Sequence, residues 1–173
     1  MEINIERMKA SELNRVAEIA VQEIYPGASI TEMKQWIKSV GDPTKVNPYV
    51  QWFVAKLKTD SKIVGFVGYD AFDFDFKGNQ VMLIQTWLAV DREYQRRKIG
   101  TELVKTALKE VCDYWRGVGR KPVMVFIETD EPDQRARKFY EKVYQQPDAK
   151  ILKDVWGRGG GTVFYFKKLD FVN

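Results

Sequence analysis

One short basic segment, Val90 to Thr101, holds the residues that most clearly could do chemistry. It reads Val-Asp-Arg-Glu-Tyr-Gln-Arg-Arg-Lys-Ile-Gly-Thr and joins an apolar run to the start of a long helical pattern. A helix start leaves main-chain N–H groups unpaired and carries positive potential, so it suits a phosphate, and Gly100 lets a ligand approach the main chain. The donors that could assist are Arg96, Arg97, Lys98 and Thr101. The segment suits an anion site, but taken alone it is more typical of a basic loop without a ligand, because short motifs often match by chance.

The residue inventory narrows the chemistry. The chain has no histidine and one cysteine, Cys112, so it lacks the usual zinc sites, the Ser-His and Cys-His nucleophiles and any internal disulfide. We therefore expect no metal. Catalysis would use carboxylates, tyrosine, lysine, arginine, hydroxyls, main-chain amides or a bound cofactor. Cys112 lies in a long helical pattern, where a small core residue is expected.

The composition is that of an ordinary soluble globular protein. The chain has 173 residues, of which 45% are hydrophobic and 30% charged, so we expect a single domain over residues 1–173. The first residues are acidic rather than basic and apolar, and the run from Val81 to Val90 is too short to span a bilayer. These features predict a cytoplasmic protein without a membrane partner.

The hydrophobic periodicity predicts an α/β protein. We expect strands over residues 3–5, 50–57, 63–76, 81–90, 123–127, 150–156 and 162–169, with 81–90 buried on both faces. We expect helices over residues 13–24, 30–40, 99–115 and from Pro132 to Val143. The strand-helix-strand stretch from Val81 to Ile127 implies a parallel crossover. The predicted fold is a mixed, mostly antiparallel central sheet of about seven strands with helices on both faces.

Two motifs on their expected elements carry a family resemblance. Residues 95–100, Gln-Arg-Arg-Lys-Ile-Gly, follow the pattern Gln/Arg-x-x-Gly-x-Gly/Ala, and residues 136–142, Ala-Arg-Lys-Phe-Tyr-Glu-Lys, follow Ala-x-x-Phe/Leu-Tyr-Glu-Lys. With these motifs and its order of elements, the chain resembles the GCN5-related N-acetyltransferase (GNAT) superfamily. Three positions differ from the family pattern: Lys98 replaces the first glycine, Asp133 a common asparagine, and Tyr144 the glycine after the second motif.

The resemblance implies a binding mode for acetyl-CoA, the only cofactor expected. The pyrophosphate would lie on the amides of the first motif, and the pantetheine arm would pair with the preceding strand. The strands that end at Val90 and Ile127 would splay apart and open a slot for the thioester. The cofactor-binding residues implied are Leu88, Ala89, Val90, Gln95, Arg96, Arg97, Lys98, Ile99, Gly100, Thr101, Asp133 and Tyr140.

The implied reaction is direct transfer of the acetyl group to a primary amine in a ternary complex. The resemblance places Tyr140 beside the thioester sulfur as the acid for the leaving thiolate, although periodicity alone makes it a core tyrosine. Glu128 matches a glutamate that acts as base, often through water, in acetyltransferases of protein N-termini; it could equally be a solvated acid at a strand end. The alternative bases are Gln85, Asp91 and Asp73.

The acceptor is not identified by the sequence. A protein N-terminus, a lysine or a small-molecule amine all fit, and Tyr25 and Trp36 are the residues we expect on the acceptor side, in and after a loop that often shapes specificity in this family. The alternative function is a non-catalytic module that binds an acyl-CoA. We expect no nucleic-acid partner, because the basic residues cluster locally and no recognition motif is visible. A homodimer is left open.

Overall fold

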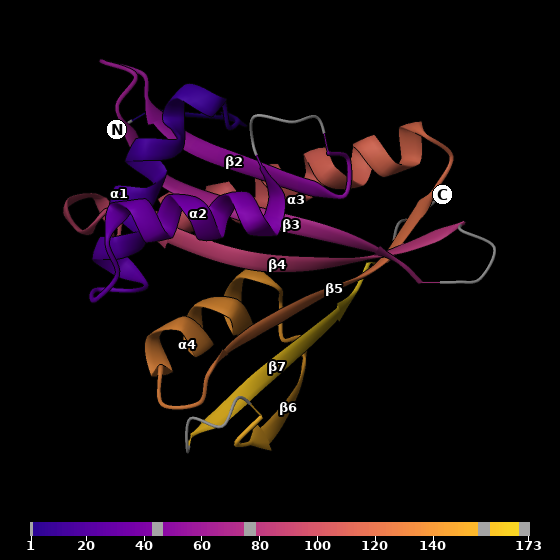
Figure 1. The fold of residues 1–173 in the computed structure, drawn as a ribbon. Coiled ribbons are helices and arrows are strands. Elements are labelled where there is room, and N and C mark those ends of the chain that lie inside the picture. The colour runs from indigo at the N-terminus through magenta and orange to yellow at the C-terminus, as the bar shows by residue number, and fades with distance from the viewer. Residues whose placement is uncertain (1, 43–46, 75–78, 156–159, 170–173) are drawn as a thin grey trace. The chain divides into compact units, whose positions relative to one another are not determined.

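The computed structural model describes residues 2–42, 47–74, 79–155 and 160–169. Seven strands are hydrogen-bonded in the order β1-β2-β3-β4-β5-β7-β6 (Figure 1). The pairs β1–β2, β2–β3, β5–β7 and β6–β7 are antiparallel, and β4–β5 is parallel. The predicted mixed, mostly antiparallel sheet of seven strands is therefore confirmed.

The elements lie close to their predicted positions. The strands are β1 Ile3–Arg7, β2 Val50–Leu57, β3 Ile63–Asp73, β4 Gln80–Val90, β5 Lys121–Asp130, β6 Asp148–Lys153 and β7 Gly161–Lys168. The helices are α1 Leu13–Glu23, α2 Ile30–Gly41, α3 Ile99–Gly117 and α4 Gln134–Val143, with short 3-10 turns η1 Ala10–Glu12 and η2 Arg92–Tyr94. The strand ends predicted at residues 76 and 156 lie outside the described residues. None of the helices in the described ranges is long and apolar enough to cross a membrane.

The chain divides into two compact units. The first contains Met1–Asp70 and Trp87–Val111, and the second contains Ala71–Thr86 and Cys112–Asn173. The single domain expected from the sequence stays a prediction.

In the first unit, α1 and α2 cover one face of β2 and β3 (Figure 1). Each helix buries apolar side chains, with Val16 of α1 and Ile37 of α2 in one cluster with Trp52 and Phe66 of the strands. Burial of such side chains is the main stabilising term of a fold of this size. Trp36 of α2, which the hydrophobic period predicts on the same inward face, is instead 46% exposed.

The first part of α3 covers the opposite face of the same strands. Successive side chains of a strand point to opposite faces, so the neighbours of Phe66 face away from α1 and α2. Accordingly, a side chain at Gly65 would meet Leu103 of α3, and the Tyr69 hydroxyl donates to the Val104 carbonyl at 3.5 Å. Helices therefore lie on both faces of this unit, as predicted.

Gly65 allows β3 to approach the end of β4. A Cβ at this position would lie 2.9 Å from the Ala89 carbonyl oxygen and 3.1 Å from Leu103 Cδ1. We expect Gly65→Ala to lower the free energy of unfolding by about 1–3 kcal/mol, because main chain must shift to admit the methyl group. Urea titration measures this change. The control is Gly27→Ala, whose Cβ would have nothing within 4 Å; equal losses for both variants would contradict the argument.

In the second unit, α4 packs beside β5 and β7 (Figure 1). The ring centroid of Tyr140 in α4 lies 6.2 Å from the ring centroid of Tyr165 in β7. The helix begins at Gln134 and not, as predicted, at Pro132. The reason is Asp133, whose carboxylate accepts hydrogen bonds from the main-chain N–H groups of Arg135 and Ala136 and so caps the helix.

β4 is less buried than predicted. Val81, Leu83, Gln85 and Ala89 are buried, whereas the other side chains of the strand are only half-buried. The expectation of burial on both faces is therefore wrong, because one set of alternate side chains lies in the core and the other set is partly covered.

Candidate functional site

The loop between β4 and α3 starts from a buried anchor. Asp91 is 4% exposed, and its carboxylate forms an ion pair with Arg15 of α1 and accepts from the Glu93 main-chain N–H at 3.1 Å. Its own N–H donates to the Val64 carbonyl at 2.9 Å. A buried charge is tolerated when it is paired and hydrogen-bonded in this way. Asp91, predicted as an alternative base, is thus engaged in holding the loop.

Gln95 ties the middle of the loop to two other elements. Its side-chain Nε2 donates to Glu23 Oε2 at 2.7 Å and to the Val90 carbonyl at 2.8 Å. Glu23, at the end of α1, also lies 3.6 Å from Arg92 Nε. The Gln95 side chain is thus used inside the unit, where it holds the main chain of the loop against α1 and the end of β4.

The loop backbone has the conformation that brings amides to a helix start. Arg96 and Lys98 have positive φ angles of 62° and 64°, in the left-handed region that favours glycine. Lys98 therefore adopts the conformation that glycine would supply at this position of the motif pattern. At the start of α3 the main-chain N–H of Glu102 donates to the Lys98 carbonyl at 3.1 Å. The amides at positions 99–101 therefore lie at a helix start that suits an anion.

Cationic side chains surround this helix start. Arg96, Arg97 and Lys98 are exposed. The Arg97 guanidinium lies 5.5 Å from the Tyr94 ring centroid, and Lys62 Nζ lies 4.9 Å from the same ring and 3.2 Å from its hydroxyl oxygen. Tyr94 thus holds two cations beside the loop. Together with the helix dipole, these charges make the loop attractive to a phosphate group.

The positive φ of Lys98 gives a stability prediction. A non-glycine residue in the left-handed region costs about 1–2 kcal/mol, and a β-branched residue costs most. We expect Lys98→Gly to keep or raise the free energy of unfolding by up to about 1 kcal/mol, and Lys98→Val to lower it. Lys105, an exposed position within α3, is the matched control. There glycine should be worse than valine, since helix propensity decides. The same order of glycine and valine at both positions in urea titrations would rule this explanation out.

Tyr140 lies in a buried hydrogen-bond network of the second unit. Gln85 Nε2 of β4 donates to the Tyr140 hydroxyl oxygen at 3.2 Å, and the Tyr144 hydroxyl donates to Gln85 Oε1 at 2.7 Å. Burial raises the pKa of Tyr140, so its hydroxyl is protonated at neutral pH. Because Gln85 is the donor in their contact, the Tyr140 proton is not used by it. The predicted alternative base Gln85 is instead the partner of Tyr140.

Three further residues that the sequence analysis singled out, Glu128, Asp133 and Cys112, lie in three different environments. Glu128 is exposed and lies inside β5, opposite Phe164 of β7, rather than at the strand end that the sequence suggested. Asp133 caps α4, so its carboxylate is used by the main chain. Cys112 is buried, and burial raises the pKa of its thiol to about 12, so it is no thiolate nucleophile at neutral pH.

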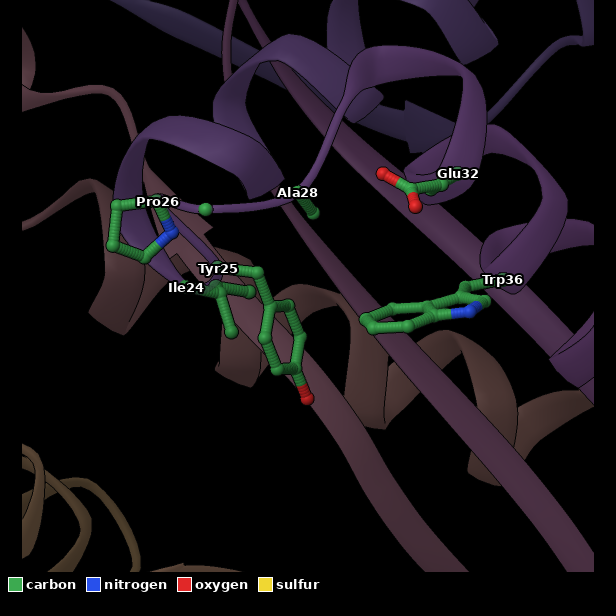
Figure 2. Close-up of a pocket in the computed structure, with 7 residues that line it drawn as sticks. Ile24, Tyr25, Pro26, Ala28, Glu32 and Trp36 are labelled. Atoms are coloured by element: carbon green, nitrogen blue, oxygen red, sulfur yellow. The ribbon is translucent and has the colours of Figure 1, made fainter.

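Tyr25 and Trp36 line one cavity, as Figure 2 shows. Their ring centroids are 5.2 Å apart in an edge-to-face arrangement, and the cavity, of about 430 Å³, lies between the loop after α1 and the first turns of α2. Glu32 also lines it. The Ser29 main-chain N–H donates to Glu32 Oε2 at 2.7 Å and lowers the pKa of that carboxyl, so it is charged. Aromatic walls with one carboxylate suit a cationic group.

Several residues of the site gave no signal in the sequence. Glu23, Arg15 and Lys62 are remote in sequence from the loop that they contact, so no spacing pattern connects them to it. Asp70 of β3, which is not placed in contact with this loop, gave no signal either: burial raises the pKa of its carboxyl to about 6, and its Oδ1 is buried without a hydrogen-bond partner in the described chain.

The predicted slot stays a prediction. The pairing of β4 with β5 extends from Gln80↔Lys121 to Gln85↔Ile127, and both strands continue beyond it. Of the residues predicted to pair with the pantetheine arm, Ala89 is buried, and Leu88 and Val90 are half-buried.

The chain matches a known protein family over most of its length. Residues 12–144 match the family described as the acetyltransferase (GNAT) family. A comparison with curated protein sequences gives no match.

Solved structures of similar fold cover nearly the whole chain. The ribosomal-protein-S18-alanine N-acetyltransferase from Escherichia coli has a TM-score of 0.72 at 14% identity, with 99% of this chain and 97% of that chain covered. NAA60 from Arabidopsis thaliana, in complex with a bisubstrate analogue, has a TM-score of 0.72 at 16% identity, with coverage of 98% and 99%. The PaiA N-acetyltransferase from Thermoplasma acidophilum, in complex with coenzyme A, has a TM-score of 0.62 at 19% identity, with coverage of 98% and 100%. At these identities the likeness shows the fold.

Proposed function

Since this chain belongs to the acetyltransferase (GNAT) family, we propose that it transfers the acetyl group of acetyl-CoA directly to a primary amine. The observation that carries the proposal is the loop before α3. Arg96 and Lys98 of this loop have positive φ angles, and the exposed side chains of Arg96, Arg97 and Lys98 lie next to the first residue of the helix. A pyrophosphate needs this combination of main-chain donors, helix dipole and charged side chains. The proposed setting is the cytoplasm.

The loop amides from Gln95 to Thr101 would bind the pyrophosphate. The exposed side chains of Arg96, Arg97 and Lys98 would add charge-assisted hydrogen bonds to its oxygens. The pantetheine arm would pair with main chain near Leu88, Ala89 and Val90, like an added strand. Among the described residues there is no group of three or more His, Cys, Asp or Glu side chains that could hold a metal ion. The proposed reaction does not use a metal ion.

The reaction needs a neutral amine, a donor to the carbonyl oxygen and a proton for the leaving sulfur. The amine nitrogen attacks the thioester carbonyl, and a main-chain N–H around Val90 would stabilise the oxygen as it gains charge. The C–S bond then breaks, and the Tyr140 hydroxyl would give its proton to the thiolate. The raised pKa of Tyr140 keeps that proton available, and the contact with Gln85 fixes the hydroxyl oxygen.

The cavity at Tyr25 and Trp36 supports an amine acceptor. Its aromatic walls and the ionised Glu32 would attract a protonated amine or a group beside it. One protein of similar fold is a ribosomal-protein-S18-alanine N-acetyltransferase. A protein N-terminus is therefore the acceptor that we would test first, with lysine and small amines beside it.

Two measurements, made one after the other, test the proposal. Acetyl-CoA at a hundred times its Kd should raise the free energy of unfolding by about 2.7 kcal/mol, whereas an oligonucleotide should not. Release of free thiol from acetyl-CoA is then followed with peptides that have free N-termini, with lysine derivatives and with small amines. Stabilisation together with acceptor-dependent thiol release supports the enzyme. Stabilisation without release from any acceptor would favour the acyl-CoA-binding module.

Glu128 is the proposed base, and its role should depend on the pKa of the acceptor. A lysine amine has a pKa of about 10.4 and an α-amine about 7.7–8.0, so the lysine needs more help to lose its proton. We expect Glu128→Gln to lower kcat by about 10²-fold, with a larger effect for a lysine-type acceptor. Asp70→Asn is the comparison variant, because burial raises the pKa of the Asp70 carboxyl to about 6. If Glu128→Gln keeps full activity while Asp70→Asn loses it, Asp70 takes the role.

A further inference from the structure

We propose that a cavity at the start of α4 is a second ligand site, which binds a small carboxylate through Arg137. The cavity has a volume of about 680 Å³ and lies within the second unit. Residues that line it are Glu131, Gln134, Arg137, Lys153, Asp154 and Gly161. This volume is in the range of small-molecule sites, and the acetyl transfer proposed above does not use any of these side chains.

Arg137 is held in place but has a donor to spare. Its Nη1 donates to the Glu131 carbonyl at 3.2 Å, and its guanidinium is hydrogen-bonded to the Tyr165 hydroxyl. Its Nε is buried and, within the described part of the chain, has no hydrogen-bond partner. A buried donor without an acceptor costs free energy, and nearly all such groups in folded proteins are paired. An acceptor supplied by a ligand would satisfy it.

The chemistry of the lining favours a carboxylate. A guanidinium offers parallel N–H groups that match the two oxygens of a carboxylate or phosphate. Lys153 is exposed, adds a second positive charge and has no ion pair among the described residues. Glu131 and Asp154 bring two negative charges to the same cavity. Because the four charges cancel, the lining has no net positive charge to offset the desolvation of a phosphate dianion, and a singly charged carboxylate costs less to desolvate.

The test follows the Arg137 Nε–Hε signal by NMR in the full chain without acetyl-CoA. The signal is assigned by its loss in Arg137→Lys. Sodium butyrate is the probe, with sodium phosphate and sodium chloride at equal ionic strength for comparison. We expect butyrate to shift the signal saturably and chloride to leave it in place. A response to phosphate alone overturns the carboxylate assignment, and equal responses to all three salts overturn the site.

Variants separate the site from general charge effects. Arg137→Lys keeps the charge but loses the parallel donors, so the Kd for butyrate, followed by nearby main-chain amides, should rise about 10- to 100-fold. Lys153→Gln changes an exposed side chain, so the fold should be kept, and it should also weaken binding. Arg135→Lys, on the exposed side of the same helix, is the matched control and should leave the Kd unchanged. An unchanged Kd in both Arg137→Lys and Lys153→Gln rules the proposal out.

Discussion

Replacing Tyr140 with phenylalanine is expected to lower kcat by about 10²–10⁴-fold and to leave the Kd for acetyl-CoA nearly unchanged. The variant removes only the hydroxyl that would protonate the leaving thiolate. The ring, which packs against Tyr165 and Phe139, is kept. Single-turnover thiol release at saturating acetyl-CoA measures the loss, and isothermal titration calorimetry measures the affinity.

Tyr144→Phe is the matched control. Tyr144 is also buried and donates to the same Gln85 side chain, so its loss disturbs the network without removing the proposed acid. We expect a decrease in kcat of no more than about tenfold, as for a lost hydrogen bond. Equal losses for the two variants would mean that the network, and not the Tyr140 proton, supports turnover. Full activity of Tyr140→Phe would remove this residue from the mechanism.

Gly100→Glu is expected to weaken acetyl-CoA binding by at least about 100-fold. The new carboxylate would stand at the helix start where the diphosphate is proposed to lie, so it would occupy that space and repel the negative charge. A glutamate in the first turn of a helix is itself favourable, so α3 should remain folded. The affinity is measured by calorimetry, and the melting temperature without ligand verifies the fold.

Gly117→Glu provides the same chemical change at the other end of α3. A Cβ at Gly117 would have nothing within 4 Å, and the position ends the helix. Acetyl-CoA should therefore bind this variant as it binds the unchanged protein. If Gly100→Glu binds acetyl-CoA normally, the loop before α3 is not the phosphate site and the proposed function loses the observation that carries it.

The sequence alone was enough to predict most of the helices and strands and the family. The hydrophobic period placed β2 and the start of α3 at their observed residues, because each pattern is local and each segment buries one stripe or face. The two motifs were equally local, since main-chain geometry at a helix start depends on neighbouring residues. Even so, the burial of β4 and the first residue of α4 were not predicted well. The first depends on what covers each face, and the second on the cap supplied by Asp133.

The tertiary structure decided which side chains support the site. Glu23 meets Gln95, and Gln85 meets Tyr140, across long separations in sequence that no periodicity can bridge. The same is true of pKa values: burial raises that of Asp70 to about 6, although its neighbours in sequence give no hint of it. That Arg137 Nε has no hydrogen-bond partner among the described residues is visible only once its neighbours in the fold are known. Local sequence fixes backbone conformation, whereas desolvation and hydrogen-bond satisfaction are properties of packing between distant segments.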